Sequence, residues 1–327
     1  MAIVVGDIIP RCTTRREVSG LLLEASSDGA GSVQLEGPGK SDYNSGTMLT
    51  PPAPSLAHRI AERLGALPQV EAVALGGSRA SGATDAMSDI DIYVYTRGDV
   101  PLADRRALVE ALGGASRASL GLTFWGPGDE WLHAPTGLEI DLVYFDADWI
   151  AAELRRVLHD HQASLGYSTC FWHTVRASQP LHDPRGWYAA LQAESHAPYP
   201  EPLRRNIVAL NHPVLRDVIP SYYAQIEKAV GRGDLVSVNH RLAALLASYC
   251  DILFAVNRVL HPGEKRLVEQ AVTLCATLPA AMADDVAAAL RAAGAPDEHL
   301  LQHVTRLLDR LDAWLAGQGL DRLGDAV

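Results

Sequence analysis

One short segment, "LGGSRASGATDAMSDIDIYVY", constrains this chain more than any other. Its second half alternates acidic and apolar residues, which is the period-2 pattern of a β-strand with two different faces. Ile90, Ile92 and Val94 belong to one face, and Asp89 and Asp91 belong to the other. Two like charges on one strand face repel each other unless a positive group lies between them. The segment therefore predicts a strand whose acidic face binds something positively charged.

The residues before this strand form a turn that suits a phosphate. The strand-like run "VEAVAL" leads into Gly76, Gly77 and Ser78, and glycines at the end of a strand let the backbone approach a ligand closely. Backbone N–H groups in such a turn bind anionic oxygens, and the serine adds a hydroxyl donor. We therefore expect a phosphate site shortly before the paired acids.

A later strand supplies two more acids. Glu139 and Asp141 are again two residues apart and alternate with apolar residues in "GLEIDLVYF". If the strands that carry Asp91 and Asp141 are neighbours, these two carboxylates and Asp89 converge beside the phosphate-binding turn. Mg²⁺ is held in such sites by carboxylates together with substrate phosphates. Two ions roughly 3.5–4 Å apart stabilise the attacking and leaving oxygens of an in-line displacement. The pattern thus predicts two Mg²⁺ ions.

These three parts, "GGSRASG", "SDIDIYVY" and "EIDLVYF", resemble the polymerase-β-like nucleotidyltransferase superfamily over roughly residues 55–195. The resemblance rests on the order and spacing of the parts, since a lone Asp-x-Asp pair carries little information. It implies a nucleotide site in which Gly77 and Ser78 bind the β- and γ-phosphates of a nucleoside triphosphate. Arg79 and Ser88 lie within the same motif, where they either shape the turn or contact the substrate.

The resemblance also implies a role for each acid. Asp89 and Asp91 would bind both the nucleotide-associated Mg²⁺ and the catalytic Mg²⁺. Asp141 would complete the catalytic metal site and help to deprotonate the acceptor hydroxyl. Glu139 is left with two interpretations, a general base on the acidic face or a supporting, solvated acid.

The rest of the chain predicts an α+β fold, with an N-terminal nucleotidyltransferase domain whose mixed β-sheet is flanked by helices, followed by an all-α helix bundle. Strands are expected at 70–75, 89–96, 119–125 and 137–145, helices at 54–67, 101–114 and 146–162, and a short strand and turn at 173–187. Beyond about residue 199 only helical spacing is found. The expected units are a flexible Gly-, Ser- and Pro-rich extension over 1–53, a catalytic domain over 54–198 and a helical substrate-binding domain over 199–327.

The helical part is similar to the C-terminal helices of bacterial small-molecule nucleotidyltransferases, including the aminoglycoside- and lincosamide-modifying group. There such helices close the cleft and contact nucleotide and acceptor. Lys265 follows a Pro-Gly break, so it either reaches the triphosphate or is a solvated surface lysine. Asn257 and Asp251, within a long helical segment, are open to the same two interpretations. No single substrate specificity follows from this half.

Composition limits the partners and the compartment. A formal net charge of −11 argues against binding to long nucleic acid, which favours a basic surface. The four cysteines show no CxxC spacing, which is typical of a protein in a reducing cytoplasm. The first residues make a poor secretory signal, and no segment has the roughly 20 apolar residues of a membrane span. The oligomeric state stays open.

The sequence therefore predicts a Mg²⁺-dependent enzyme that transfers a nucleoside monophosphate to a hydroxyl of a small molecule and releases pyrophosphate. The expected nucleoside monophosphate is AMP, with ATP as its donor. Two alternatives stay open. The acceptor could instead be a protein side chain or an RNA end, and the chain could be a nucleotide-binding regulatory module without turnover. Retention of all three acids speaks against the second alternative, because a non-catalytic module has no physical need for them.

Overall fold

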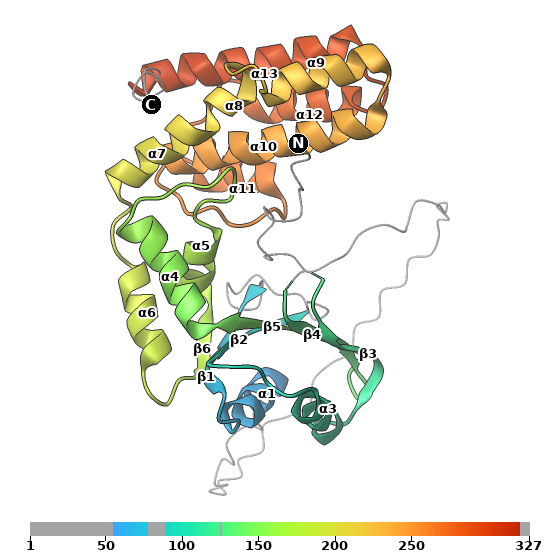
Figure 1. Cartoon of the computed structure of the whole chain (residues 1–327), viewed down its shortest axis with the longest axis vertical. Coiled ribbons are helices and arrows are strands. Elements are labelled where there is room, and N and C mark those ends of the chain that lie inside the picture. The colour runs from blue at the N-terminus through green and yellow to red at the C-terminus, as the bar shows by residue number, and fades with distance from the viewer. Residues whose placement is uncertain (1–54, 78–88, 125, 321–327) are drawn as a thin grey trace, which may run out of the picture.

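The computed structural model describes residues 55–77, 89–124 and 126–320. A region built on a β-sheet is followed by a region made only of helices (Figure 1). This order confirms the predicted α+β fold class. The predicted extension over residues 1–53 lies outside the described residues, and the boundary near residue 199 stays a prediction.

A mixed sheet organises the first region. Its six strands lie in the order β3-β4-β5-β2-β1-β6. They are β1 (Val70–Leu75), β2 (Ile90–Thr96), β3 (Ala115–Leu122), β4 (Gly128–His133), β5 (Glu139–Asp146) and β6 (Gln179–His182). Strands β2 and β5 pair in parallel, and the other neighbouring strands are antiparallel. The parallel pair thus joins the two strands on which the sequence places its acids.

The two faces of the sheet pack against different helices. On one face Ile92 and Leu142 belong to a core shared with α1 (Leu56–Gly65) and α3 (Leu102–Ala111). On the other face, Tyr93 and Phe145 pack in a core with α4 (Ala147–Leu158), α5 (Cys170–Ala177) and α6 (Trp187–Ser195). Figure 1 shows α1 and α3 on one side of the sheet and α4–α6 on the other. The second core covers the ends of β2 and β5, so their first residues, which include the acids, lie outside it.

Three elements differ from the sequence-based expectation. Strand β4 was not expected, because its alternation is broken by a buried acid, Asp129. Strand β3 starts at Ala115 and ends at Leu122, earlier at both ends than the predicted 119–125. The segment 173–187 was interpreted as strand and turn, but helix α5 extends to Ala177 and only β6 is extended. Helices α5 and α6 are short and rich in aromatic residues, which weakens the helical periodicity of their sequences.

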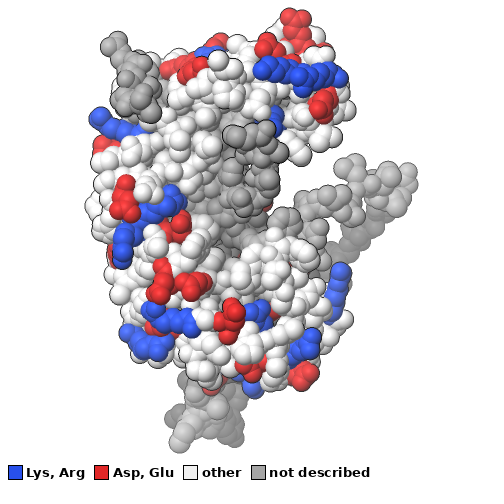
Figure 2. All heavy atoms as spheres, in the orientation of Figure 1, with Lys and Arg blue, Asp and Glu red and all other residues white. Residues whose placement is uncertain are grey.

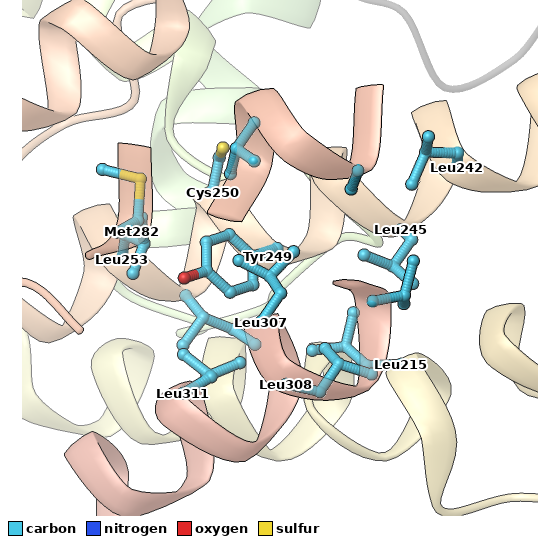
Figure 3. Close-up of a cluster of buried hydrophobic side chains, with 14 of the residues drawn as sticks. Leu215, Leu242, Leu245, Tyr249, Cys250, Leu253, Met282, Leu307, Leu308 and Leu311 are labelled. Carbon is cyan, nitrogen blue, oxygen red and sulfur yellow. The ribbon is translucent and has the colours of Figure 1, made fainter. Parts of the chain in front are cut away.

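The second region is a bundle, as predicted. Its helices are α7 (Glu201–Asn211), α8 (Pro213–Arg216), α9 (Tyr222–Arg232), α10 (Leu235–Val256), α11 (Leu267–Leu274), α12 (Met282–Ala292) and α13 (Glu298–Gly317). Helix α10 is the centre of the bundle, and almost all of its last two turns is buried. Figure 3 shows Tyr249 of α10 beside Leu307 of α13, in a cluster that also contains Leu245 and Leu311. In the described part of the chain, every helix is too short or too polar for a bilayer crossing.

A buried polar network joins the bundle to the loop between α4 and α5. Asp251 of α10 accepts hydrogen bonds from the backbone N–H of Ser168 at 3.1 Å and from its hydroxyl at 2.6 Å. The side-chain oxygen of Asn211 accepts a bond from the N–H of Gly166 at 2.9 Å. Burial raises the pKa of Asp251 to about 7. The loop is therefore fixed on the bundle by buried hydrogen bonds rather than by apolar contact alone.

Candidate functional site

The predicted glycine turn lies directly against the acidic strand. The N–H of Gly76 donates to the backbone oxygen of Asp91 at 2.9 Å, and a Cβ on Gly76 would lie 2.3 Å from the ring of Tyr93. Gly77 has a φ of +64°, and a Cβ there would lie only 1.8 Å from Oδ2 of Asp91. Both positions therefore require glycine, at Gly77 for conformation and for space. The result is a backbone turn in contact with a carboxylate.

The acids of β2 and β5 lie side by side, as the sequence predicts for neighbouring strands. Asp91 and Asp141 are directly opposite each other in the parallel register. Neighbouring strands are about 4.8 Å apart and paired residues share a face, so both carboxylates project on the same side. Asp89 immediately precedes β2, and Glu139 begins β5 on the same face as Asp141. All four acids are half-buried.

Strand β4 adds an acid that the sequence interpretation missed. Glu130 is paired with Asp141 in the antiparallel register of β4 and β5 and is half-buried. Asp91, Asp141 and Glu130, which we call the acid row, therefore cross three adjacent strands. The turn residues "APTG" directly before the alternating segment "LEIDLVYF" are a local signal that favours a hairpin with the residues before them. Recognising that hairpin in the sequence would have placed Glu130 on the acidic face.

Another acid of β4, Asp129, is fully buried on the opposite face of the sheet and fixes the strand there. Asp129 has no exposed surface and accepts hydrogen bonds at 2.7 Å from the hydroxyl of Tyr144 and from the N–H of Gly121. The guanidinium of Arg105 lies 3.5 Å from the same carboxylate and 4.2 Å from the centre of the Tyr144 ring. Burial and the nearby Asp129 charge raise the pKa of Tyr144. These contacts link β3, β4 and β5 and hold Glu130 on the other side of the sheet.

The acid row suits a hard cation supplied together with a phosphate ligand. Within the described ranges, no three His, Cys, Asp or Glu side chains are close enough to form a metal site by themselves. Mg²⁺ is usually bound through one or two carboxylates plus substrate phosphates, and the Asp91–Asp141 pair provides that number. The absence of a Cβ at Gly77 leaves room for the Asp91 carboxylate directly against the backbone of the turn. The residues therefore fit Mg²⁺ carried by a nucleotide.

Three of the predicted nucleotide-binding residues, Ser78, Arg79 and Ser88, lie outside the described residues. Lys265 is described, and it is exposed in the turn before α11.

The segment that leads to Lys265 is anchored on the first region. The N–H of His261 donates to the hydroxyl of Thr169 at 2.8 Å, and its Nδ1 lies 3.3 Å from Sγ of Cys170. Burial lowers the pKa of His261 to about 3, so the ring is neutral and carries no charge into the core. The segment just before Lys265 is thus fixed next to the start of α5.

The two other polar residues considered in the bundle are engaged internally. Asp251 is 1% exposed and bonds to Ser168. Asn257 donates to the backbone oxygens of Leu253 and Thr277 and accepts from the N–H of Thr277. These contacts support a role for both side chains in holding the structure together.

Charge on the described surface is mixed. Figure 2 shows Lys and Arg interleaved with Asp and Glu over the face in view, without a continuous basic stripe among its described residues. An open hollow of about 530 Å³ lies on the bundle between α9 and α13, lined by Tyr223 and Arg306 among others. It is formed by bundle residues alone, so it is separate from the acid row.

Comparison with known proteins supports the interpretation of the first region. Residues 57–155 match the family model described as a nucleotidyltransferase domain. This segment runs from α1 into α4 and contains Gly77 and the whole acid row. It covers less than half of the chain, and supports the predicted superfamily and nucleotidyl transfer as the general chemistry, without distinguishing an aminoglycoside-type subgroup.

One solved structure, a nucleotidyltransferase-like protein from Exiguobacterium sibiricum 255-15, is similar to this chain at 15% sequence identity. The match covers 82% of this chain and 76% of that chain, with a TM-score of 0.40. No curated protein matches the chain.

Proposed function

We propose that this chain, whose residues 57–155 match a nucleotidyltransferase domain, transfers a nucleoside monophosphate to a hydroxyl of a small molecule. ATP is the proposed donor, and pyrophosphate is the second product. The observation that carries the proposal is the registered pair Asp91 and Asp141 with the Gly77 backbone against the first carboxylate. This pairing puts two acids beside a turn that can bind phosphate oxygens.

Each group in the site then has a part in the reaction. Gly77 and Ser78 bind the β- and γ-phosphates, and Lys265 neutralises part of their charge. The acceptor oxygen attacks the α-phosphorus, the bond from that phosphorus to the bridging oxygen breaks, and pyrophosphate leaves. The hydroxyl proton passes to a carboxylate of the acidic face. Catalysis of this kind depends mainly on positioning and on charge neutralisation.

Two Mg²⁺ ions complete the proposed site. Asp89 and Asp91 would hold both ions, and Asp141 would hold the catalytic one. When bound, Mg²⁺ supplies charge neutralisation for the phosphates and the leaving group. Arg79 and Ser88 would shape the turn or contact the nucleotide.

The net charge of −11 argues against a long nucleic acid as the acceptor and is compatible with a small molecule. Cys170, Cys250 and Cys275 are free thiols, which is compatible with a reducing cytoplasm.

The test compares the wild-type protein with Asp91→Asn, which removes one charge but keeps the shape of the side chain. Thermal unfolding is measured with each of the four nucleoside triphosphates, with and without Mg²⁺, and pyrophosphate release is measured with a panel of hydroxyl compounds. We expect Mg²⁺-dependent stabilisation by one nucleotide in the wild type, and loss of both stabilisation and turnover in Asp91→Asn. Asp99→Asn, an exposed acid beyond the end of β2, is the matched control. Unchanged turnover in Asp91→Asn would refute the assignment.

A further inference from the structure

The acid row has a direction, because its two ends meet different neighbours. At one end, the backbone of Asp91 pairs with Gly76, which follows β1. At the other end, Glu130 of β4 pairs with Ser119 of β3. The order across the sheet is therefore glycine turn, Asp91, Asp141, Glu130 and Ser119.

This order separates two sides of the proposed site. In the proposed function the glycine turn is the phosphate side, because the backbone N–H groups of such a turn bind phosphate oxygens. The leaving pyrophosphate belongs to that side. In an in-line displacement the attacking oxygen approaches opposite to the leaving group. The acceptor hydroxyl is therefore expected on the side of Glu130 and Ser119.

Glu130 is available for the acceptor in a way that its neighbours are not. Among the described residues, its side chain has no hydrogen-bond or ion-pair partner, and it faces Asp141 directly. Two like charges in directly opposite positions destabilise a sheet. Its side chain is also one methylene longer than that of Asp141, so its carboxylate extends farther from the sheet.

The fold holds Glu130 in this unfavourable position. Its neighbour Asp129 is locked on the opposite face by Tyr144, Gly121 and Arg105. Because successive residues of a strand point to opposite faces, Glu130 cannot turn away from Asp141 without breaking that buried network. A half-buried acid kept beside another acid, at a cost to stability, is typical of a functional position.

We propose that Glu130 accepts the proton of the attacking hydroxyl. This inference rests on the proposed function and moves the general base from Asp141, where the resemblance puts it, to β4. Asp141 is then left to bind metal, and a carboxylate that binds metal is a weaker proton acceptor than one that does not. In the step, the O–H bond of the acceptor breaks and its proton passes to the Glu130 carboxylate. The oxygen forms its bond to the α-phosphorus as the bond to pyrophosphate breaks.

The experiment uses the full chain with Mg²⁺ and ATP, and with water as the acceptor, so that AMP and pyrophosphate are the measured products. Wild type is compared with Glu130→Gln, Glu130→Asp and the control Glu110→Gln, an exposed acid on α3. Thermal stabilisation by Mg²⁺ and ATP reports the nucleotide side. The rate of AMP formation reports the proton transfer.

We expect Glu130→Gln to keep the nucleotide-induced stabilisation and to form AMP about 10²–10⁴-fold more slowly, which is the usual contribution of a general base. Glu130→Asp, which keeps a carboxylate, should restore part of the lost rate. A structural role alone would not make the rate depend on a carboxylate rather than an amide at this position. If Glu130→Gln matches the wild type in rate, the inference is wrong and the proposed function stands. If the wild type shows no stabilisation by Mg²⁺ and any nucleotide, the proposed function fails, and the role of Glu130 fails with it.

Discussion

The contact between Gly77 and Asp91 gives the sharpest test of the site geometry. In Gly77→Ala the new Cβ would lie 1.8 Å from Oδ2 of Asp91, whereas real Cβ atoms stay beyond 3.0 Å. The carboxylate must therefore move by roughly 1 Å or more, which is enough to cost about 10²-fold in a positioned site. The left-handed φ of +64° adds about 1–2 kcal/mol of strain for alanine.

A second glycine separates the strain from the contact. Gly233, at the C-terminal end of α9, has a φ of +65° and nothing within 4 Å of an added Cβ. Gly233→Ala therefore suffers the same backbone strain without touching an acid. Both variants should lose about 1–2 kcal/mol in the free energy of unfolding, measured by urea titration. Only Gly77→Ala should also lose affinity for Mg²⁺ with ATP, by about 10²-fold in calorimetric titration.

Two results would contradict this reasoning. If Gly77→Ala binds Mg²⁺ and ATP with wild-type affinity, the contact between the turn and Asp91 has no part in nucleotide binding. If Gly233→Ala weakens binding equally, the loss comes from general destabilisation rather than from displacement of the carboxylate.

Two further predictions concern the buried acids that hold the fold. Because burial raises the pKa of Asp251 to about 7, the folded state binds this proton more tightly than the unfolded state, so the stability of the wild type should fall as the pH rises from about 4 to about 7. Asp251→Asn should remove that part of the pH dependence in urea titrations, and an unchanged slope would contradict the raised pKa. Asp129→Ala should cost about 3–5 kcal/mol in the free energy of unfolding, because it leaves Arg105 and the Tyr144 hydroxyl buried without their partner. The exposed Asp99→Ala should stay within about 0.5 kcal/mol of the wild type, and equal losses in the two variants would show that the Asp129 network contributes nothing.

Much of the architecture could be predicted because the local patterns were strong. Strand β1 has the predicted ends, since an apolar run before two glycines leaves few choices. Strand β4 was missed for a physical reason. Its buried Asp129 pairs with groups from α3, β3 and β5, and no local pattern can show that a carboxylate has buried partners far away in the sequence.

The sequence by itself determined that two strands carry acids on one face and that a glycine turn precedes the first of them. Period-2 alternation and the conformational freedom of glycine are local properties, so they can be derived residue by residue. Only the tertiary structure decided which strands are neighbours, that Asp91 and Asp141 are in register, and that Glu130 joins their row. Register is fixed by pairing between distant segments and by buried contacts such as those of Asp129. The acids are therefore a feature of the sequence, and their common site is a feature of the fold.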